Sequence, residues 1–189
     1  MDVVIKNTPP AQTYALDSLS AHENNEIAFS VGESDIGRVL VARSNMGICT
    51  ILIESGAGEL RVDLSSGYPG STLIRDDERL RGDLEKVTRF IKTPNERLDL
   101  PLDIRGTPFE RRVWEVLRTV RVGAVITYAA LARRIGQPDA LCAVANACTN
   151  NPLALAIPGR RVVRTNGTLA GYHRRVERKC ALINREVLV

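Results

Sequence analysis

The chain has 189 residues, of which 44% are hydrophobic and 25% are charged, and its formal net charge is +4. This length and apolar content exclude a short peptide and allow one or two compact domains with a buried core. No run approaches the roughly 18 apolar residues of a membrane span, and the first twenty residues lack the basic start and apolar block of a secretion signal.

Cysteine and histidine give little support for a metal site. No two cysteines have the CxxC spacing of metal or redox sites. The cysteines and histidines of the chain are Cys49, Cys142, Cys148, Cys180, His22 and His173. We therefore expect a reduced, cytoplasmic monomer with no metal, no other cofactor and no membrane partner.

The charge is distributed unevenly along the chain. Residues 1–104 carry 11 basic and 17 acidic side chains, whereas residues 105–189 carry 15 basic and 5 acidic ones. Clustered Lys and Arg supply the part of nucleic-acid affinity that does not depend on base sequence. The second half is thus expected to contact a polyanion, or else to present an arginine-rich solvated surface.

The first half of the chain is predicted to be an α/β domain over residues 23–104. Residues 1–22 contain Pro9-Pro10 and show no sustained period, which indicates a loosely ordered leader. The short apolar runs EIAFSVG, GRVLVARS and GICTILIES follow, and they predict a small antiparallel sheet. Apolar residues at helical spacing predict helices near residues 58–64 and over residues 77–91. Residues 94–104 are expected to be a connector with one short extended piece.

A strong helix signal opens the second half, residues 105–189. Thr107-Pro108-Phe109-Glu110 places a threonine at the cap, a proline at the first helical position and a glutamate three residues after the cap. This pattern predicts a helix from Pro108 to about Thr119. Its expected buried stripe is Phe109, Val113, Trp114 and Leu117, which leaves Arg111, Arg112 and Arg118 in solvent.

Two further helices are predicted around a tight turn. The first runs from about Tyr128 to Ile135, Gly136 ends it, and the second runs from near Pro138 to about Thr149. Two short helices around a glycine-containing turn form a helix-turn-helix, which often presents its second helix to DNA. Helical hairpins are also common without that role.

The second helix of this pair has an unusually smooth face. Its small residues are Ala143, Ala145, Asn146 and Ala147. They permit either close packing against another helix or close approach to the DNA minor groove. The absence of Lys and Arg from this helix argues against ordinary reading of bases in the major groove.

The final part is predicted to contain a strand-like run, a turn and a helix. LALAIPG is the apolar run, and Asn166-Gly167 is the turn signal. The last helix is expected over residues 175–187, with a buried stripe of Val176, Cys180, Ile183 and Val187. We accordingly expect Cys180 and Cys49 to lie in the core and to have no reactive role.

Several stretches of the second half carry a family resemblance. They are LPLDIRGTPF, VWEVLRTV, ITYAALA, AVANAC, NNPLALAIP, RRVVRTNGTLAGY and RKCALINRE, which run in order over residues 100–186. The chain resembles an alkylguanine-DNA alkyltransferase, above all the carboxy-terminal half of the Ada-type proteins. The resemblance implies an amino-terminal α/β domain with a ribonuclease H-like antiparallel sheet. It also implies a helical domain whose helix-turn-helix enters the minor groove and flips a damaged guanine into a pocket.

The resemblance also implies that the reactive groups have been replaced. The family motif is Pro-Cys-His-Arg, in which a cysteine activated by histidine and glutamate removes the alkyl group. The cysteine position falls on Gly159 and the histidine position on Arg160. Pro158 and Arg161 match the motif, and Glu186 keeps the place of the orienting carboxylate. Gly159 would enlarge the pocket and Arg160 would bring positive charge to it, which suits bulky or anionic adducts.

The remaining site residues follow from the same resemblance. Tyr128 matches a tyrosine that presses on a phosphate, Asn151 matches an asparagine that braces the active loop, and Cys142 replaces an arginine that fills the gap left by the flipped base. Flipping is then less well supported unless Leu141 or another residue takes over. The expected DNA-facing residues are Tyr128, Cys142, Ala143, Asn146, Ala147 and Arg161. The expected alkylguanine pocket comprises Cys148, Asn151, Pro158, Gly159, Arg160, Tyr172 and His173.

Three hypotheses about function are compatible with the sequence. The first is a non-catalytic protein that binds double-stranded DNA and senses alkylated guanine, with a repair or regulatory protein as a second partner. The second is a transferase in which another cysteine, such as Cys148, replaces the nucleophile with His173 as its imidazole. The third is a scaffold that binds a small molecule or a protein and no longer touches DNA.

Overall fold

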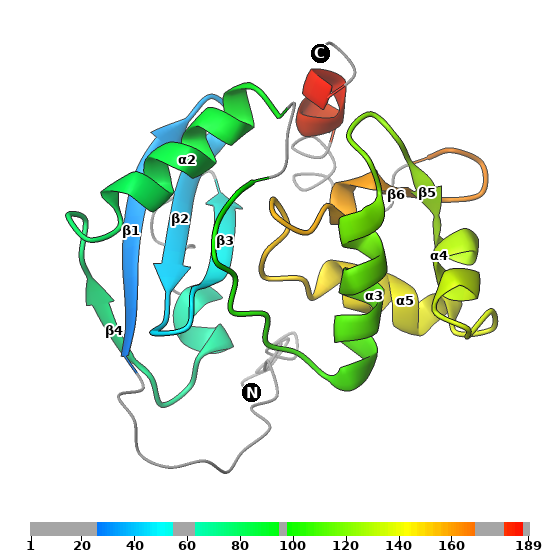
Figure 1. The fold of residues 1–189 in the computed structure, drawn as a ribbon, viewed down its shortest axis with the longest axis horizontal. Coiled ribbons are helices and arrows are strands. Elements are labelled where there is room, and N and C mark those ends of the chain that lie inside the picture. Colours follow the sequence, from blue (N-terminus) through cyan, green and yellow to red (C-terminus); the bar gives the residue numbers. More distant parts are fainter. Residues whose placement is uncertain (1–25, 55–62, 95–97, 169–179, 187–189) are drawn as a thin grey trace, which may run out of the picture.

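The computed structural model describes residues 26–54, 63–94, 98–168 and 180–186. These residues form a sheet lobe from the first half of the chain and a helical lobe from the second half, joined by residues 98–107 (Figure 1). The predicted leader, residues 1–22, lies outside the described residues. Within the described ranges, none of the helices has the length and apolar character needed to cross a membrane.

The sheet lobe contains four strands in the order β3-β2-β1-β4. The three predicted runs form β1 (Glu26–Ser34), β2 (Gly37–Arg43) and β3 (Ile48–Glu54), which pair antiparallel in chain order. This confirms the predicted meander. β4 (Thr72–Arg75) adds a parallel pair with β1, and its pattern gives no strand signal because it is short and largely exposed. The sheet is therefore mixed, with antiparallel pairs in the majority.

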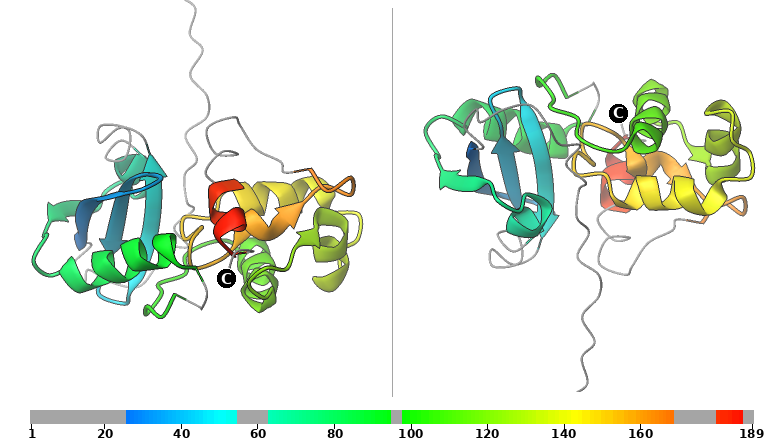
Figure 2. Two further views of the ribbon diagram at one scale, coloured as in Figure 1. Left: turned by 90° about the horizontal axis from the view of Figure 1, so that it is seen from above. Right: turned by 90° about the horizontal axis from the view of Figure 1, so that it is seen from below.

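Both faces of the sheet are covered. The four central residues of β2, Val39–Ala42, have no exposed surface. α2 (Arg81–Lys92) packs against β1 and β2 on one face, and helical residues 63–67 cover the other (Figure 2). Burial on both faces explains why β2 is a continuous apolar run rather than an alternating one.

The predicted helix over residues 77–91 starts later than expected. Residues 77–80 form a turn, in which the Asp76 side chain accepts a hydrogen bond from the Arg79 N–H at 2.9 Å. α2 therefore begins at Arg81. Of the helix predicted near residues 58–64, only residues 63 and 64 are described, and they belong to the helical segment 63–67.

α3 (Pro108–Thr119) opens the helical lobe with the predicted bounds. The Thr107 hydroxyl accepts a hydrogen bond from the Glu110 N–H at 3.2 Å, and the Glu110 carboxylate accepts one from the Thr107 N–H at 2.9 Å. This capping box is confirmed. The predicted buried stripe holds for Val113, Trp114 and Leu117, whereas Phe109 is only partly buried. The predicted exposed residues Arg111, Arg112 and Arg118 are exposed.

The predicted helix-turn-helix is formed by α4 (Tyr128–Arg134) and α5 (Leu141–Thr149). Gly136 follows α4 with φ +76°, a left-handed conformation that ends the helix, as expected. α5 begins at Leu141 rather than near Pro138, because the Pro138-Asp139 pair forms a turn closed by a 3.1 Å hydrogen bond from the Ala140 N–H to the Gln137 carbonyl.

The apolar run LALAIPG is not a strand. Residues 152–156 form consecutive turns, which lead into the short 3-10 helix η1 (Gly159–Arg161) and the strand β6 (Val162–Val163). β6 pairs with β5 (Ile126–Thr127) in parallel. The run is apolar because Leu153, Leu155 and Ile157 are buried. The Asn166-Gly167 turn is present, with Gly167 at φ +79°.

The last helix differs from its prediction in the residues that it buries. Residues 180–186 are helical, and the described part buries Leu182 and Glu186, whereas Cys180 and Ile183 are only partly buried. Val176 and Val187 lie outside the described residues. A charged residue thus occupies a core-facing position that the apolar pattern could not assign. Cys49, by contrast, lies in the core as expected.

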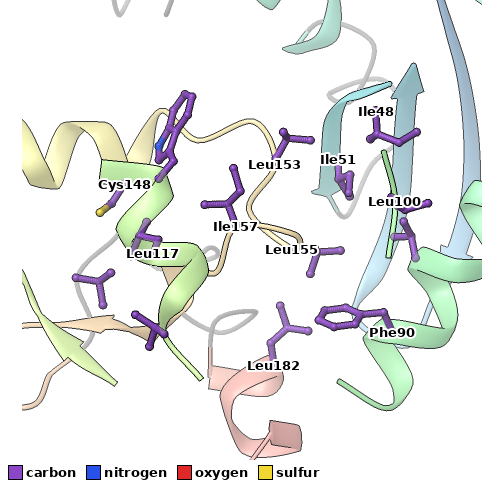
Figure 3. Packing of buried hydrophobic residues seen from close by; sticks show 14 of the residues in the cluster. Ile48, Ile51, Phe90, Leu100, Leu117, Cys148, Leu153, Leu155, Ile157 and Leu182 are labelled. Carbon is purple, nitrogen blue, oxygen red and sulfur yellow. The ribbon is translucent and has the colours of Figure 1, made fainter. Parts of the chain in front are cut away.

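The two lobes share one cluster of buried apolar side chains. Ile48, Ile51 and Phe90 of the sheet lobe belong to the same cluster as Leu155 and Leu182 (Figure 3). Backbone hydrogen bonds also join the lobes, including one from the Ile51 N–H to the Pro152 carbonyl at 2.8 Å. The division of the chain at residue 105 therefore stays a prediction.

Candidate functional site

Asn151 fixes the loop that leads to Gly159. Its side-chain amide donates a hydrogen bond to the Ile157 carbonyl at 2.9 Å, and its side-chain oxygen accepts one from the Leu153 N–H at 2.9 Å. The Asn151 side chain is buried, so both bonds are shielded from water. The site of Gly159 is thus held by a rigid frame.

Gly159 itself has room for a side chain. A Cβ at this position would lie 3.4 Å from the Cys148 carbonyl oxygen and 3.8 Å from the Asn151 side-chain nitrogen, which are ordinary contact distances. The backbone of Gly159 also does not have a positive φ. Neither space nor backbone conformation requires glycine here.

Arg160 is buried and turns toward Glu186. Its Nε donates to Glu186 Oε1 at 2.7 Å, and its Nη2 lies 2.6 Å from the same oxygen. Its Nη1 donates to the carbonyls of Ala154 and Leu155 at 3.2 and 3.1 Å. The guanidinium also lies 5.5 Å from the ring centroid of Phe90 on α2, within cation–π range. Arg160 therefore links the loop, the last helix and the sheet lobe.

Arg161 binds the same carboxylate from another direction. Its Nε donates to Glu186 Oε2 and its Nη2 donates to Oε1, both at 2.9 Å. Its Nη1 donates to the Val120 carbonyl at 2.5 Å. The Glu186 side chain is 1% exposed, and each of its oxygens accepts hydrogen bonds from arginine. Glu186 is therefore fully engaged by two guanidinium groups.

The pKa shift of Glu186 agrees with a charged triad. Burial lowers the pKa of Arg160, an effect that the neighbouring Glu186 opposes. Burial alone would raise the pKa of Glu186, but the hydrogen bond from Arg161 and the charge of Arg160 outweigh it, so this pKa lies below its ordinary value. Glu186 thus stays ionised between its two partners.

These contacts correct two expectations about the arginines. Arg161 is expected on the DNA-facing surface, but it is buried because its guanidinium pairs with Glu186. Arg160 is expected to bring a positive charge into a lesion pocket, but its charge is directed at Glu186 instead. In both cases an acidic partner distant in sequence determines the side-chain direction.

The outward face of α5 contains most of the other predicted DNA-facing residues. Cys142, Ala143 and Asn146 are exposed, and Leu141 at the start of the helix is 44% exposed. Ala147 is 1% exposed, so it does not belong to this face. The Ala147 carbonyl accepts a 2.8 Å hydrogen bond from the Trp114 indole on α3. This bond holds that side of α5 against α3, so Ala147 faces the core rather than DNA.

Tyr128 opens α4 and is half-buried. Burial and the nearby Cys148 raise the pKa of Tyr128, and the positive charge of Arg164 offsets this only in part. The phenol therefore stays protonated and can donate a hydrogen bond to an anion such as a phosphate. Cys148 is buried and Pro158 adjoins Gly159, whereas Tyr172 and His173 lie outside the described residues.

Two partners of the arginines have no signal in the sequence. Phe90 lies in α2 of the sheet lobe, and the Val120 carbonyl lies just after α3. Both are distant from the loop along the chain and have residue types that are common in any core. Sequence patterns alone could not have identified either one.

Comparison with known proteins assigns this fold to a family. A family model described as "6-O-methylguanine DNA methyltransferase, DNA binding domain" matches residues 108–188. The chain is 35% identical over 111 residues to the methylated-DNA–protein-cysteine methyltransferase of Mycobacterium bovis, which covers 59% of this chain and 67% of that protein. This chain belongs to the alkylguanine-DNA alkyltransferase family. The family resemblance expected from the sequence is thereby confirmed.

Two further members of the alkyltransferase family show how far the likeness extends. The chain is 40% identical over 164 residues to the bifunctional transcriptional activator/DNA repair enzyme Ada of Escherichia coli, which covers 87% of this chain and 46% of Ada. It therefore spans about half the length of that relative. The structure of Mycobacterium tuberculosis OGT in complex with DNA superposes with a TM-score of 0.69 at 26% identity, covering 86% of this chain and 93% of that one.

Proposed function

We propose that this alkyltransferase-family protein binds duplex DNA through the exposed face of α5 and recognises alkylated guanine without removing the alkyl group. The observation that carries the proposal is the pairing of Glu186 with Arg160 and Arg161 beside a glycine at position 159. Removal of the alkyl group by displacement needs a nucleophile, which is a cysteine sulfur in the family motif, and a group that accepts its proton. Gly159 provides no sulfur, and a guanidinium has no acceptor atom.

The surface around α5 supports DNA binding. Short side chains on its outward face permit close approach to a narrow groove. Two exposed arginines of α4, Arg133 and Arg134, and the exposed Arg164 after β6 can pair with phosphates. The likeness to a family member whose structure contains DNA points in the same direction.

A binding experiment tests the DNA-binding part. Fluorescence anisotropy would compare a plain duplex with one that carries a single O6-methylguanine. We expect binding to both duplexes and a lower Kd for the lesion duplex. Ala143→Glu, which places a negative charge on the exposed face, should raise the Kd about tenfold or more, because it opposes the phosphates. Thr72→Glu on the exposed strand β4 is the matched control, with a change of no more than about twofold.

Two outcomes of the anisotropy experiment would contradict binding through the α5 face. No binding to either duplex, even at low salt, would contradict the proposal and leave the scaffold hypothesis. Equal loss of affinity in Ala143→Glu and Thr72→Glu would show that net charge rather than the α5 face governs binding.

A labelling experiment tests the absence of transfer. A duplex with a radiolabelled methyl group on O6 of guanine would be incubated with this protein and, as positive control, with the Mycobacterium tuberculosis protein. We expect no label on this chain and stoichiometric label on the control. Stoichiometric label on the wild-type chain would overturn the proposal, and its loss in Cys148→Ser would identify Cys148 as the nucleophile. Gly159→Cys/Arg160→His, which the space at Gly159 permits, is expected to gain transfer.

A further inference from the structure

Leu141 is an exposed apolar residue at the edge of the proposed DNA-binding face. It is the first residue of α5, and its exposed fraction is 44%. Among the described residues, the other large apolar side chains with this degree of exposure are Met46, Ile74 and Val125. None of those three lies in α4 or α5, so Leu141 is set apart by its position rather than by its exposure.

The neighbours of Leu141 on α5 are too short to reach far from the helix. Cys142, Ala143 and Asn146 are exposed, and the other large apolar residue of the helix, Val144, is fully buried. All nine residues of α5 are described. Leu141 is therefore the large apolar side chain on the exposed face of α5 that can contact DNA packed against this face.

The start of α5 presents Leu141 without a polar cap beside it. The residue before the helix, Ala140, makes no side-chain cap, and the first turn contains no acidic residue. The exposed Asp139 nevertheless directly precedes Ala140 and brings negative charge to this end of the helix. We therefore expect this end of α5 to contact DNA through the apolar Leu141 side chain rather than by binding a phosphate at the helix terminus.

We propose that Leu141 is the wedge that enters the base stack when α5 lies in the minor groove. Proteins that bind this groove insert apolar side chains of this kind between base steps, which unstacks and kinks the duplex. A leucine fills the opened space by apolar contact and makes no base-specific hydrogen bond. The inference rests on the proposed DNA binding, and it adds the residue that would hold the stack open.

A fluorescent base tests the wedge separately from binding. The duplex carries one O6-methylguanine and a neighbouring 2-aminopurine, whose emission rises when it unstacks. At saturating wild-type protein we expect a rise in emission, which Leu141→Ala should reduce to about the level of the free duplex and Leu141→Phe should retain. Anisotropy of the same duplex should show a change in Kd of no more than about threefold for both variants, because phosphate contacts dominate affinity. Met46→Ala, at a still more exposed apolar residue on the other lobe, should behave as wild type.

Each outcome separates the wedge from DNA binding itself. Emission that does not rise with bound wild-type protein, or that is unchanged by Leu141→Ala at saturation, overturns the wedge while the proposed function stands. Loss of the signal in both Leu141 variants also overturns it, because a larger apolar side chain should serve. No anisotropy change with wild-type protein overturns the proposed function and the wedge together.

Discussion

Glu186 accepts hydrogen bonds from Arg160 and Arg161 and thereby fastens the last helix to the loop after Asn151. In the reaction that the family resemblance implies, a carboxylate at this position orients an imidazole. With two guanidinium groups as partners, the carboxylate instead neutralises buried positive charge. Under the proposed function, Arg160 at the histidine position of the family motif therefore gives this carboxylate a structural role in place of a catalytic one.

Removing the charge of Glu186 should destabilise the fold and change its response to acid. Glu186→Gln leaves two buried guanidinium groups unpaired, so we expect a loss of about 3–5 kcal/mol in the free energy of unfolding at pH 7. Urea unfolding measures this loss. Glu33→Gln, which breaks an exposed pair with Arg38, is the control and should cost less than about 1 kcal/mol.

The sign of the pH dependence follows from the lowered pKa of Glu186. A carboxyl whose pKa is lower in the folded state stabilises the protein above its unfolded pKa, about 4.3, and this contribution is lost as the pH falls through the folded pKa. The wild-type protein should therefore lose more stability between about pH 5 and pH 3 than Glu186→Gln does. Parallel curves for the two proteins would contradict the charged triad.

α5 has a buried side and an exposed side, and neither side carries a charged residue. Val144, Ala147 and Cys148 face the core, and the outward positions are short or polar. α5 is thus positioned by packing against its neighbours. Because it contains no Lys or Arg, positive charge for contact with phosphates must come from arginines outside the helix. We therefore expect the affinity of α5 for DNA to be sensitive to any charge added to its outer face.

Cys142→Arg tests this property of α5. Cys142 is exposed, so the substitution adds a cation without disturbing the core. We expect the Kd for a duplex to fall about threefold to tenfold and the dependence of log K on log salt to steepen by about 0.9, as one more phosphate contact requires. Anisotropy titrations at several salt concentrations measure both quantities. Thr72→Arg on β4 is the control, and an equal gain there would show that position on α5 is irrelevant.

The two lobes are joined through side chains as well as through the chain itself. Arg160 lies over the Phe90 ring, and Arg185 donates to the Ile91 carbonyl at 2.7 Å, so α2 contacts both the loop and the last helix. Both lobes also contribute to one apolar cluster. We therefore expect this shared core to make unfolding cooperative across residue 105.

Cooperative unfolding can be measured with two probes. The single tryptophan, Trp114, reports on the helical lobe, and far-UV circular dichroism reports on both lobes. We expect coincident urea transitions. Phe90→Ala, in the sheet lobe, should lower the stability seen by both probes by about 3–5 kcal/mol, whereas the exposed Ile74→Ala should have little effect. Separate transitions, or an effect on circular dichroism alone, would indicate two independent domains.

Local patterns determined the elements whose signals lie within a few residues of one another. β1, β2 and β3 follow from short apolar runs between turn residues, α3 follows from its capping box, and Gly136 marks the end of α4. The start of α5 and the run LALAIPG were predicted less well. A buried turn and a buried strand have the same apolar composition, so composition could not distinguish them.

Residue identity along the chain was enough to indicate the family and the order of the main elements, and it predicted the replacement at Gly159 and Arg160. The inward turn of Arg160 and Arg161 toward Glu186 and the burial of Ala147 became evident in the three-dimensional fold. Those outcomes depend on partners that are distant in sequence. The orientation of a side chain depends on the charged or apolar groups within its reach, and the fold determines which groups those are.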